Sequence, residues 1–177
     1  MRTARAAAGS IVFLLVVPGV VAGVVPWLLT RWRPADHAAV WLPFRIAGLL
    51  LVAVGLAALL HAFARFVVEG LGTPAPVAPT ERLVVGGLYR YVRNPIYLAV
   101  GAVIVGQALA LGRPVLLLYA VAFAVAVAVF VRAYEEPTLL RRFGAEYVAY
   151  ARAVPAWWPR RDPWTPEDGA PAGPAAR

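Results

Sequence analysis

Four long apolar runs constrain this chain more strongly than any other feature of its sequence. They cover residues 10–29, 44–68, 95–111 and 115–131. A helix needs about 20 mostly apolar residues to cross the hydrocarbon core of a bilayer, and about 17 is the lower limit. Lipid offers the backbone no hydrogen-bond partners, so runs of this length fold as helices. We therefore predict an all-α integral membrane protein with four transmembrane helices.

The composition narrows the chemistry that such a protein can perform. The chain has 177 residues, 62% of them hydrophobic, and no cysteine, which excludes disulfides, thiolate metal sites and a cysteine nucleophile. Its two histidines, His37 and His61, argue against a multi-histidine metal site, and we expect no metal. All basic residues are arginines, and they flank the apolar runs, so the net charge of +8 indicates membrane lipids rather than nucleic acid as partners.

The first two runs each leave one question open. Arg2 and Arg5 precede the first run, so a signal peptide is the alternative, but a length of about 20 residues favours a transmembrane helix. In the second run, His61 and Arg65 lie four residues apart on one helical face. Arg65 is close enough to the end of the run to snorkel to the interface. His61 lies deeper and is a candidate functional residue of unassigned role.

The third and fourth runs are predicted to form a tight antiparallel hairpin, because only Gly112, Arg113 and Pro114 separate them. A single kinked helix is the alternative. The following residues, 138–153, repeat apolar side chains at helical spacing and predict an amphipathic helix at the membrane interface. We place one domain over residues 1–161 and a disordered tail rich in proline, alanine and glycine over residues 162–177.

The distribution of arginines predicts the orientation. Four spans put both termini on one side of the membrane, together with all arginines except Arg31, Arg33, Arg45 and Arg113. Because cytoplasmic segments carry the excess of arginine, we expect cytoplasmic termini in an inner or plasma membrane. Five spans would instead separate the long loop before residue 95 from the C-terminal helix. Trp27, Trp32 and Trp41 are typical of an interfacial aromatic belt.

Two polar clusters flank the predicted hairpin, so they should be neighbours in space. The first is GLYRYVRNPIY, residues 87–97, and the second is RAYEEPTLLRRFGAEYVAY, residues 132–150. Structural roles explain many of these residues individually: Asn94 and Pro95 suit a helix start, with asparagine as the cap. Arg132 and Glu136 lie four residues apart and would share one helical face, as a helix anchor or as a charged pair presented to a ligand.

Both clusters resemble signatures of one family. The first resembles the signature G-x-Y-x-x-x-R-H-P-x-Y of the isoprenylcysteine carboxyl methyltransferase family. Residues 135–159 resemble its C-terminal signature, E-E-x-x-L-x-x-x-F-G-x-x-Y-x-x-Y-x-x-x-V-P. Its superfamily includes phosphatidylethanolamine N-methyltransferases. The resemblance covers residues 73–159. Asn94 stands where this family usually has histidine, and an asparagine keeps hydrogen-bonding capacity but cannot titrate.

The resemblance implies a small helical membrane bundle that binds S-adenosylmethionine in a cytoplasm-facing pocket and admits a lipophilic acceptor from the bilayer. The implied cofactor contacts are Glu81, Arg82, Leu83, Val84, Tyr89, Asn94, Pro95, Ile96 and Tyr97. The implied substrate contacts are Arg93, Arg132, Glu135 and Glu136, of which Arg132 and Glu136 would be catalytic.

The resulting hypothesis is an S-adenosylmethionine-dependent methyltransferase that acts on a lipophilic small-molecule or prenylated acceptor, as isoprenylcysteine carboxyl O-methyltransferases do. One alternative is a phospholipid N-methyltransferase, for which Glu136, with Glu135 beside it, would accept the amine proton. Another is a non-catalytic membrane scaffold on the same fold, which Asn94 keeps open. A transporter or channel would need more intramembrane polar groups than these runs contain.

Overall fold

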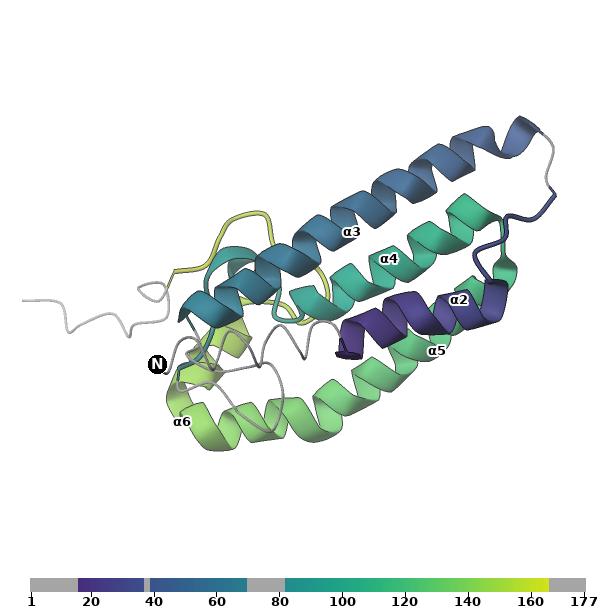
Figure 1. The fold of residues 1–177 in the computed structure, drawn as a ribbon. Coiled ribbons are helices and arrows are strands. Elements are labelled where there is room, and N and C mark those ends of the chain that lie inside the picture. Colours follow the sequence, from purple (N-terminus) through teal and green to yellow (C-terminus); the bar gives the residue numbers. More distant parts are fainter. Residues whose placement is uncertain (1–15, 37–38, 70–81, 166–177) are drawn as a thin grey trace, which may run out of the picture.

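The computed structural model describes residues 16–36, 39–69 and 82–165, and these ranges contain helices and loops but no β-strand. The helical segments are listed in chain order, with their bounds, at the end of this paragraph, and Figure 1 shows the α-helices side by side. The bounds of α4 are those predicted for the third run, and α3 and α5 lie within a few residues of theirs. The segments are the π-helical turn Val20–Val24, α2 (Val25–Thr30), the short 3₁₀ helix Ala39–Trp41, α3 (Leu42–Glu69), the 3₁₀ helix Gly87–Arg90, α4 (Pro95–Leu111), α5 (Pro114–Phe130), the π-helical turn Val131–Glu135 and α6 (Glu136–Ala153).

Two helices in the described residues are long and apolar enough to cross a membrane by themselves. One is Leu42–Arg65, and the other begins at Pro114 and continues without interruption into α6. Val16–Thr30 and Pro95–Leu111 are apolar but shorter, and residues 10–15 of the first predicted span lie outside the described ranges. The all-helical fold is therefore confirmed for the described residues, whereas four complete spans remain a prediction.

α3 and α4 form the most extensive helix pair, and glycines bring their backbones into contact. A Cβ atom added at Gly48 would lie 2.5 Å from both the Ala110 nitrogen and the Gly106 oxygen. One added at Gly106 would lie 2.7 Å from the Gly48 oxygen. Small residues that permit such an approach are typical of helix pairs in membranes, where van der Waals contact replaces the hydrophobic effect.

The N-terminal helix is bound into the bundle by two polar side chains. The π-helical turn Val20–Val24 shifts the backbone hydrogen-bond register, and the carbonyl groups of Val21 and Ala22 accept side-chain donors. The Tyr119 hydroxyl donates to Val21 at 2.9 Å, and the Gln107 amide donates to Ala22 at 2.7 Å. Both donors lie within apolar helices, where an unpaired polar group would be costly. Sequence reasoning missed these contacts.

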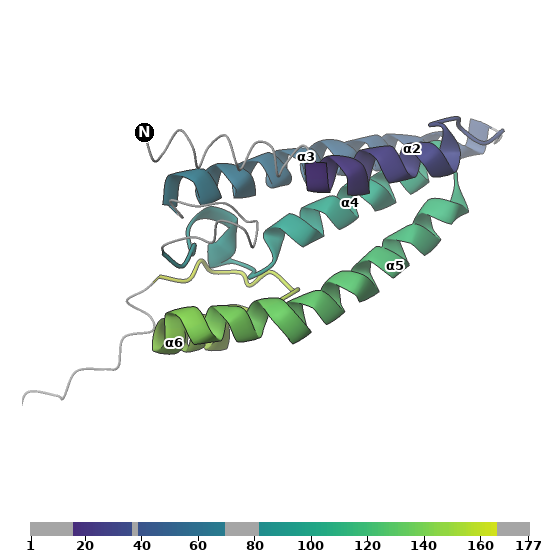
Figure 2. The ribbon, with the colours of Figure 1, turned by 60° about the horizontal axis from the view of Figure 1, so that its bottom comes forward.

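The predicted hairpin is confirmed, and the single kinked helix is wrong. α4 ends at Leu111, Gly112 adopts the left-handed conformation, and α5 begins at Pro114. The Arg113 side chain donates to the Arg33 carbonyl at 3.0 Å and so ties this turn to the loop after α2. Figure 2 shows the two helices diverging from the turn, so that α5 lies farthest from α4 at its C-terminal end.

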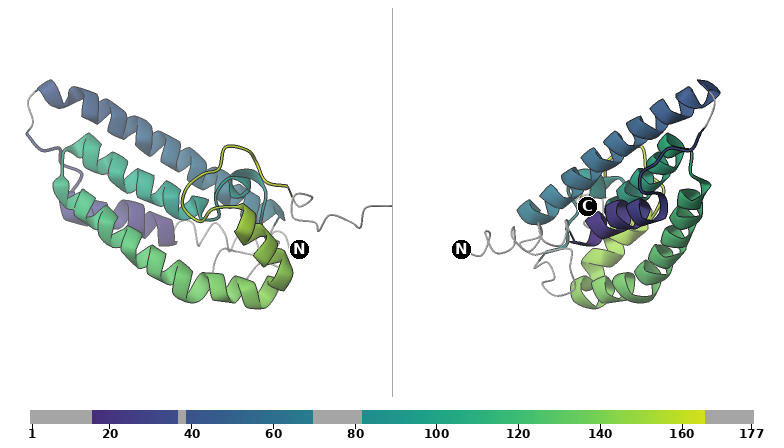
Figure 3. Two further views of the ribbon diagram at one scale, coloured as in Figure 1. Left: turned by 180° about the vertical axis from the view of Figure 1, so that it is seen from behind. Right: turned by 45° about the vertical axis from the view of Figure 1, so that its right-hand side comes forward.

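The C-terminal helix differs from the single interfacial helix predicted over residues 138–153. α6 continues from α5 through the π-helical turn Val131–Glu135, and it bends sharply at Gly144, whose φ of 51° and ψ of −123° are non-helical. Glycine tolerates this conformation because it lacks a Cβ atom. The second arm of α6 therefore folds back (Figure 3, left) and buries its apolar face against the protein itself.

The packed chain also extends beyond the predicted domain boundary at residue 161. Trp164 is only 4% exposed and packs against Tyr147, Tyr150 and Val154. The predicted disordered tail therefore does not begin at residue 162, because this tryptophan supplies a large apolar surface to the core. Residues 166–177 of the predicted tail lie outside the described ranges.

Candidate functional site

Residues 154–165, which we call the C-terminal strap, run back across the motif at residues 87–97. Backbone groups make most of the connections, so the strap is attached to the motif much as a strand is attached to its neighbour. Connecting hydrogen bonds include Arg93 N to Pro155 O at 2.9 Å, Arg160 N to Tyr91 O at 2.9 Å, Trp164 N to Arg90 O at 3.0 Å and Arg90 Nε to Trp164 O at 2.8 Å.

Asn94 occupies the cap position of α4, but its side chain does not cap the helix. The side-chain amide donates instead to the Ala156 carbonyl of the strap at 3.1 Å, and the residue is only 7% exposed. The predicted asparagine cap is therefore wrong, because the strap offers this buried amide an acceptor on the other side. Pro95 follows at the first helical position, as predicted.

The two predicted clusters meet at the open base of the α4–α5 hairpin through an ion pair. Arg93 Nη1 donates to Glu136 Oε1 at 2.8 Å and to the Tyr147 hydroxyl at 3.0 Å. The Arg93 and Glu136 side chains are 17% and 33% exposed, so solvent screens the pair only partly. The sequence suggested Arg132 as the partner of Glu136, but Arg93 takes that place because the strap holds its backbone against the second arm of α6.

A second contact between the clusters joins the first turn of α4 to the π-helical turn after α5. The Tyr97 hydroxyl donates to Glu135 Oε2 at 2.9 Å. Burial raises the pKa of Glu135, and the charge of Glu136 adds to this effect, whereas the hydrogen bond from Tyr97 opposes it. Glu135 is thus the carboxyl group of this site that holds a proton more readily than an ordinary glutamate.

The other predicted cofactor residues gather around the motif, mostly as packed side chains. Val84 and Tyr89 are buried in one small core cluster, Ile96 packs against it, and Leu83 packs against Tyr147 and Tyr150. Arg82 is exposed, and Glu81 lies outside the described residues. The structure therefore brings these residues to one end of the bundle. They do not all line one cavity.

His61 and Arg65 belong to the same end of the molecule. A Cβ atom added at Gly87, the first residue of the motif, would lie 2.6 Å from His61 Nε2 and 3.0 Å from Arg65 Cγ. The end of α3 therefore packs directly against the motif. This contact places His61 beside the site rather than along the middle of the apolar bundle.

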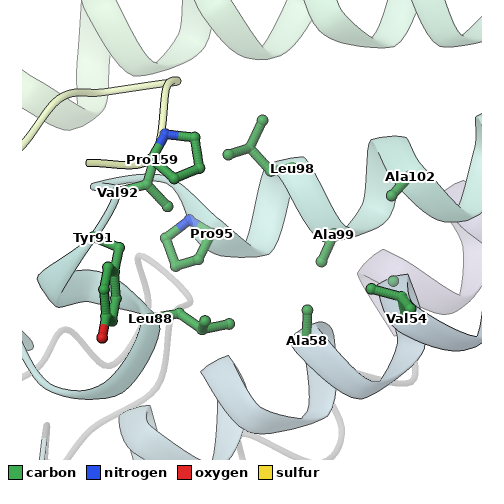
Figure 4. Close-up of a pocket in the computed structure, with 11 residues that line it drawn as sticks. Val54, Ala58, Leu88, Tyr91, Val92, Pro95, Leu98, Ala99, Ala102 and Pro159 are labelled. Carbon is green, nitrogen blue, oxygen red and sulfur yellow. The ribbon is translucent and has the colours of Figure 1, made fainter. Parts of the chain in front are cut away.

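A first cavity, of about 430 Å³, lies between α3, the start of α4 and the strap. Figure 4 shows Pro159 of the strap beside Val92 and Pro95, with Val54 and Ala58 of α3 on the far side. The lining is almost wholly apolar. Pro95 of the motif and Pro159 of the strap both line this cavity, so the cavity depends on the contact between these two segments.

A second cavity, of about 440 Å³, has a charged lining. Arg132 lines it, and its side chain makes no hydrogen bond or ion pair with any described residue. Arg152, which sequence reasoning did not single out, lines it from the second arm of α6. Arg152 lies four residues after Val148, so the two side chains share one face of the helix. The bend at Gly144 turns this face toward Arg132. The full lining is Arg93, Arg132, Glu136, Pro137, Leu140, Tyr147, Val148, Ala151 and Arg152.

A family model described as phospholipid methyltransferase matches residues 44–146, which is more than half of the chain. The chain belongs to this family. Membership of the phospholipid methyltransferase family makes the protein a membrane methyltransferase, in agreement with its long apolar helices.

The match also confirms the resemblance to the isoprenylcysteine and phospholipid methyltransferase superfamily. It begins in α3 and ends in α6, and it includes Arg93, Tyr97, Glu135 and Glu136. Arg152 and the strap follow the matched region. Neither the curated proteins nor the solved structures compared with the chain give a match.

Proposed function

We propose that this protein is an integral membrane methyltransferase that uses S-adenosylmethionine and acts on a lipophilic acceptor. The observation that carries this proposal is the pairing of Arg93 with Glu136 and of Tyr97 with Glu135 at the base of the hairpin. These pairs fix two adjacent carboxyl groups next to a cavity that is both charged and apolar. The family membership supports the reaction class.

The residues at this base fit the proposed cofactor. S-Adenosylmethionine has an amino-acid end with a carboxylate and an ammonium group, and the Arg93–Glu136 pair offers a guanidinium for the first and a carboxylate for the second. The cavity volume of about 440 Å³ falls within the range of small-molecule sites, about 300–1,000 Å³. The aromatic and apolar residues of the motif would hold the adenosine.

The protein's contribution to the reaction is alignment. When bound, S-adenosylmethionine supplies a methyl group on a good leaving group, so the acceptor needs orientation and exclusion of water more than activation. Arg93 holds the Glu136 carboxylate in one position, and Arg132 has no partner among the described residues that would compete with an acceptor. The divergence of α5 from α4 (Figure 2) marks the side on which a lipid chain would enter from the bilayer.

Two acceptor classes are consistent with this site. A prenylcysteine carboxylate is already ionised at neutral pH, so Arg132 would orient it without a base. A phospholipid amine must lose a proton, and the raised pKa of Glu135 suits that task better than Glu136, which Arg93 holds in an ion pair. The phospholipid methyltransferase match supports the second class. The Asn94 side chain has a structural task at the strap, so its presence in place of histidine does not by itself favour the scaffold alternative.

We also propose the orientation expected from the arginine distribution, with four spans and cytoplasmic termini. The strap and both motifs lie at one end of the bundle, which agrees with a single cytoplasmic site (Figure 1). A reporter fused to the C-terminus should therefore be active only in the cytoplasm. Reporter activity on the side of the membrane opposite the cytoplasm would overturn this orientation.

The reaction is tested by incubating the purified protein with methyl-labelled S-adenosylmethionine and a total lipid extract. Label released by base indicates an ester, and base-stable label indicates N-methylation. Glu136→Gln and Arg132→Ala should lower transfer by about 10²-fold or more, because a misplaced reactant loses the advantage of alignment. Trp158→Ala is the matched control, since Trp158 is 82% exposed. Full transfer in both site variants would contradict the assigned site.

A further inference from the structure

The second cavity carries more positive charge than its own residues neutralise. Three arginines, Arg93, Arg132 and Arg152, line it together with the single carboxylate of Glu136. Arg93 is committed to Glu136 and Tyr147, so it neutralises the only acidic group in the lining. The side chains of Arg132 and Arg152 make no hydrogen bond or ion pair in the part of the chain that the structure describes. Two unbalanced positive charges therefore face one cavity, and this field favours an anion.

The fold brings these two arginines together from opposite sides of a bend. Arg132 lies in the π-helical turn before α6, and Arg152 lies near the end of its second arm. Gly144, between them, reverses the helix direction. Without that bend the two guanidinium groups would lie on separate turns of one long helix, and they would not line one cavity.

The same cavity has an apolar lining beside its charges. Pro137, Leu140, Val148 and Ala151 contribute it, from both arms of α6. A ligand that fits both parts carries an anionic group next to a hydrocarbon body. Arginine is the side chain best suited to the charged part, because its planar fork can form two parallel hydrogen bonds with a carboxylate or a phosphate.

We propose that Arg132 and Arg152 form an anion-binding pair that recognises the acidic group of the methyl acceptor. The identification of the ligand as the methyl acceptor rests on the proposed function, whereas the anion pair itself does not. The acidic group is an oxyanion attached to a lipid: the phosphodiester of a glycerophospholipid or the carboxylate of a prenylated cysteine. Arg152 thereby becomes a specificity-determining residue that lies outside the region matched by the family.

Binding to soluble lipid probes tests the pair without requiring methyl transfer. The full-length protein in detergent is titrated calorimetrically with dihexanoylphosphatidylethanolamine and with N-acetyl-S-farnesylcysteine. Dihexanoylglycerol and the farnesylcysteine methyl ester are the matched probes that lack the anion. At least one acidic probe should bind more tightly than its neutral counterpart. Whether this is the phosphatidylethanolamine or the farnesylcysteine shows whether the pair recognises a phosphodiester or a carboxylate.

The variants Arg132→Gln and Arg152→Gln should each raise the Kd of that acidic probe by about 10-fold or more, as expected for loss of a hydrogen bond between charged groups. They should leave the Kd of the neutral probe unchanged. Arg161→Gln is the matched control, because Arg161 is an exposed arginine of the strap that does not line the cavity. Arg152→Lys should recover part of the affinity, since it restores the charge without the planar fork.

Three results would overturn the anion pair. They are equal affinity for acidic and neutral probes, absence of binding by either acidic probe, and an equal loss in Arg161→Gln. The unfolding temperatures of the variants show whether a loss of probe affinity comes from misfolding. If Arg152→Gln is misfolded, the affinity of Arg152→Lys for the acidic probe tests the anion pair instead. Probe binding without methyl transfer would refute the proposed function and leave the anion pair intact.

Discussion

The α3–α4 pair and the base of the α4–α5 hairpin share one helix, yet they are held together in different ways. Against α3, α4 makes apolar contacts so close that glycine backbones touch. At the hairpin base, α4 meets its neighbours through Arg93, Asn94 and Tyr97, each of which donates to a defined oxygen atom. Packing thus fixes the frame, and directional hydrogen bonds fix the site.

This difference separates stability from function within a short chain. The crossing at which the glycine backbones of α3 and α4 touch has no space for a ligand, whereas cavities and polar groups border the start of α4 and the base of the hairpin. Sites built on rigid elements hold their geometry better than sites on free loops. The strap supplies the connection, because it joins the motif of α4 to the second arm of α6 through backbone hydrogen bonds.

Removal of the Trp164 side chain should have the largest effect on this arrangement. Trp164→Ala deletes a buried ring that packs against Tyr150 with a centroid distance of 5.3 Å. Truncation of a buried tryptophan costs about 3–5 kcal/mol of unfolding free energy, which denaturation in detergent can measure. Trp158→Ala, at an 82% exposed tryptophan of the same strap, should change stability little. Equal effects of the two variants would show that the strap is not a packed element.

An added methyl group tests the other region. Gly48→Ala places a Cβ atom 2.5 Å from backbone atoms of α4, so the helices must separate, at a cost of about 1–3 kcal/mol. Gly23→Ala is the matched control, because nothing lies within 4 Å of its added Cβ atom. Thermal unfolding should show a loss for Gly48→Ala alone. A Gly48→Ala protein as stable as the control would contradict the close crossing.

A double-mutant cycle measures the ion pair at the hairpin base. Arg93→Gln and Glu136→Gln each break a partly buried charged hydrogen bond, and their coupling energy should be about 1–2 kcal/mol. Urea unfolding of the wild type, both single variants and the double variant gives this value. A coupling near zero would mean that Arg93 is only a solvated arginine of the motif.

The smallest expected effect is a dependence of stability on pH. Because burial raises the pKa of Glu135 in the folded state, the contribution of Glu135 to stability is greatest at low pH and falls as pH rises from the usual glutamate pKa through the folded one. Tyr97→Phe removes the hydrogen bond that opposes this shift and should steepen the fall. Glu135→Gln should flatten the same profile. An unchanged profile in Tyr97→Phe would disprove the contact.

The sequence predicted helices well where a simple physical rule applied. The lengths of the apolar runs located α3, α4 and α5, and the three residues Gly112 to Pro114 dictated the hairpin. The hairpin in turn placed the Arg93 and Glu136 clusters together. What could not be predicted were partners chosen by tertiary structure. Arg93 rather than Arg132 binds Glu136, and Asn94 binds Ala156 rather than its own helix.

Other features of the site depended on a bend or on a distant segment. Arg152 enters the second cavity because Gly144 reverses α6, and helical periodicity alone does not register such a reversal. Trp164 lies in a stretch whose composition is typical of disorder, and its burial follows from the apolar face of α6 that it covers. The hydrogen bonds of Gln107 and Tyr119 could not be predicted, because the π-helical turn that supplies their acceptors has no sequence signature.

The position of the strap in the chain has a consequence for biosynthesis. Its residues leave the ribosome only after α3, α4 and α5 have been made, so those helices can enter the membrane before the motif receives its last hydrogen-bond partners. Insertion and assembly of the site are therefore separate events. A chain interrupted before residue 154 would retain its membrane helices but lack the contacts from Pro155 and Ala156 that hold Arg93 and Asn94 in place.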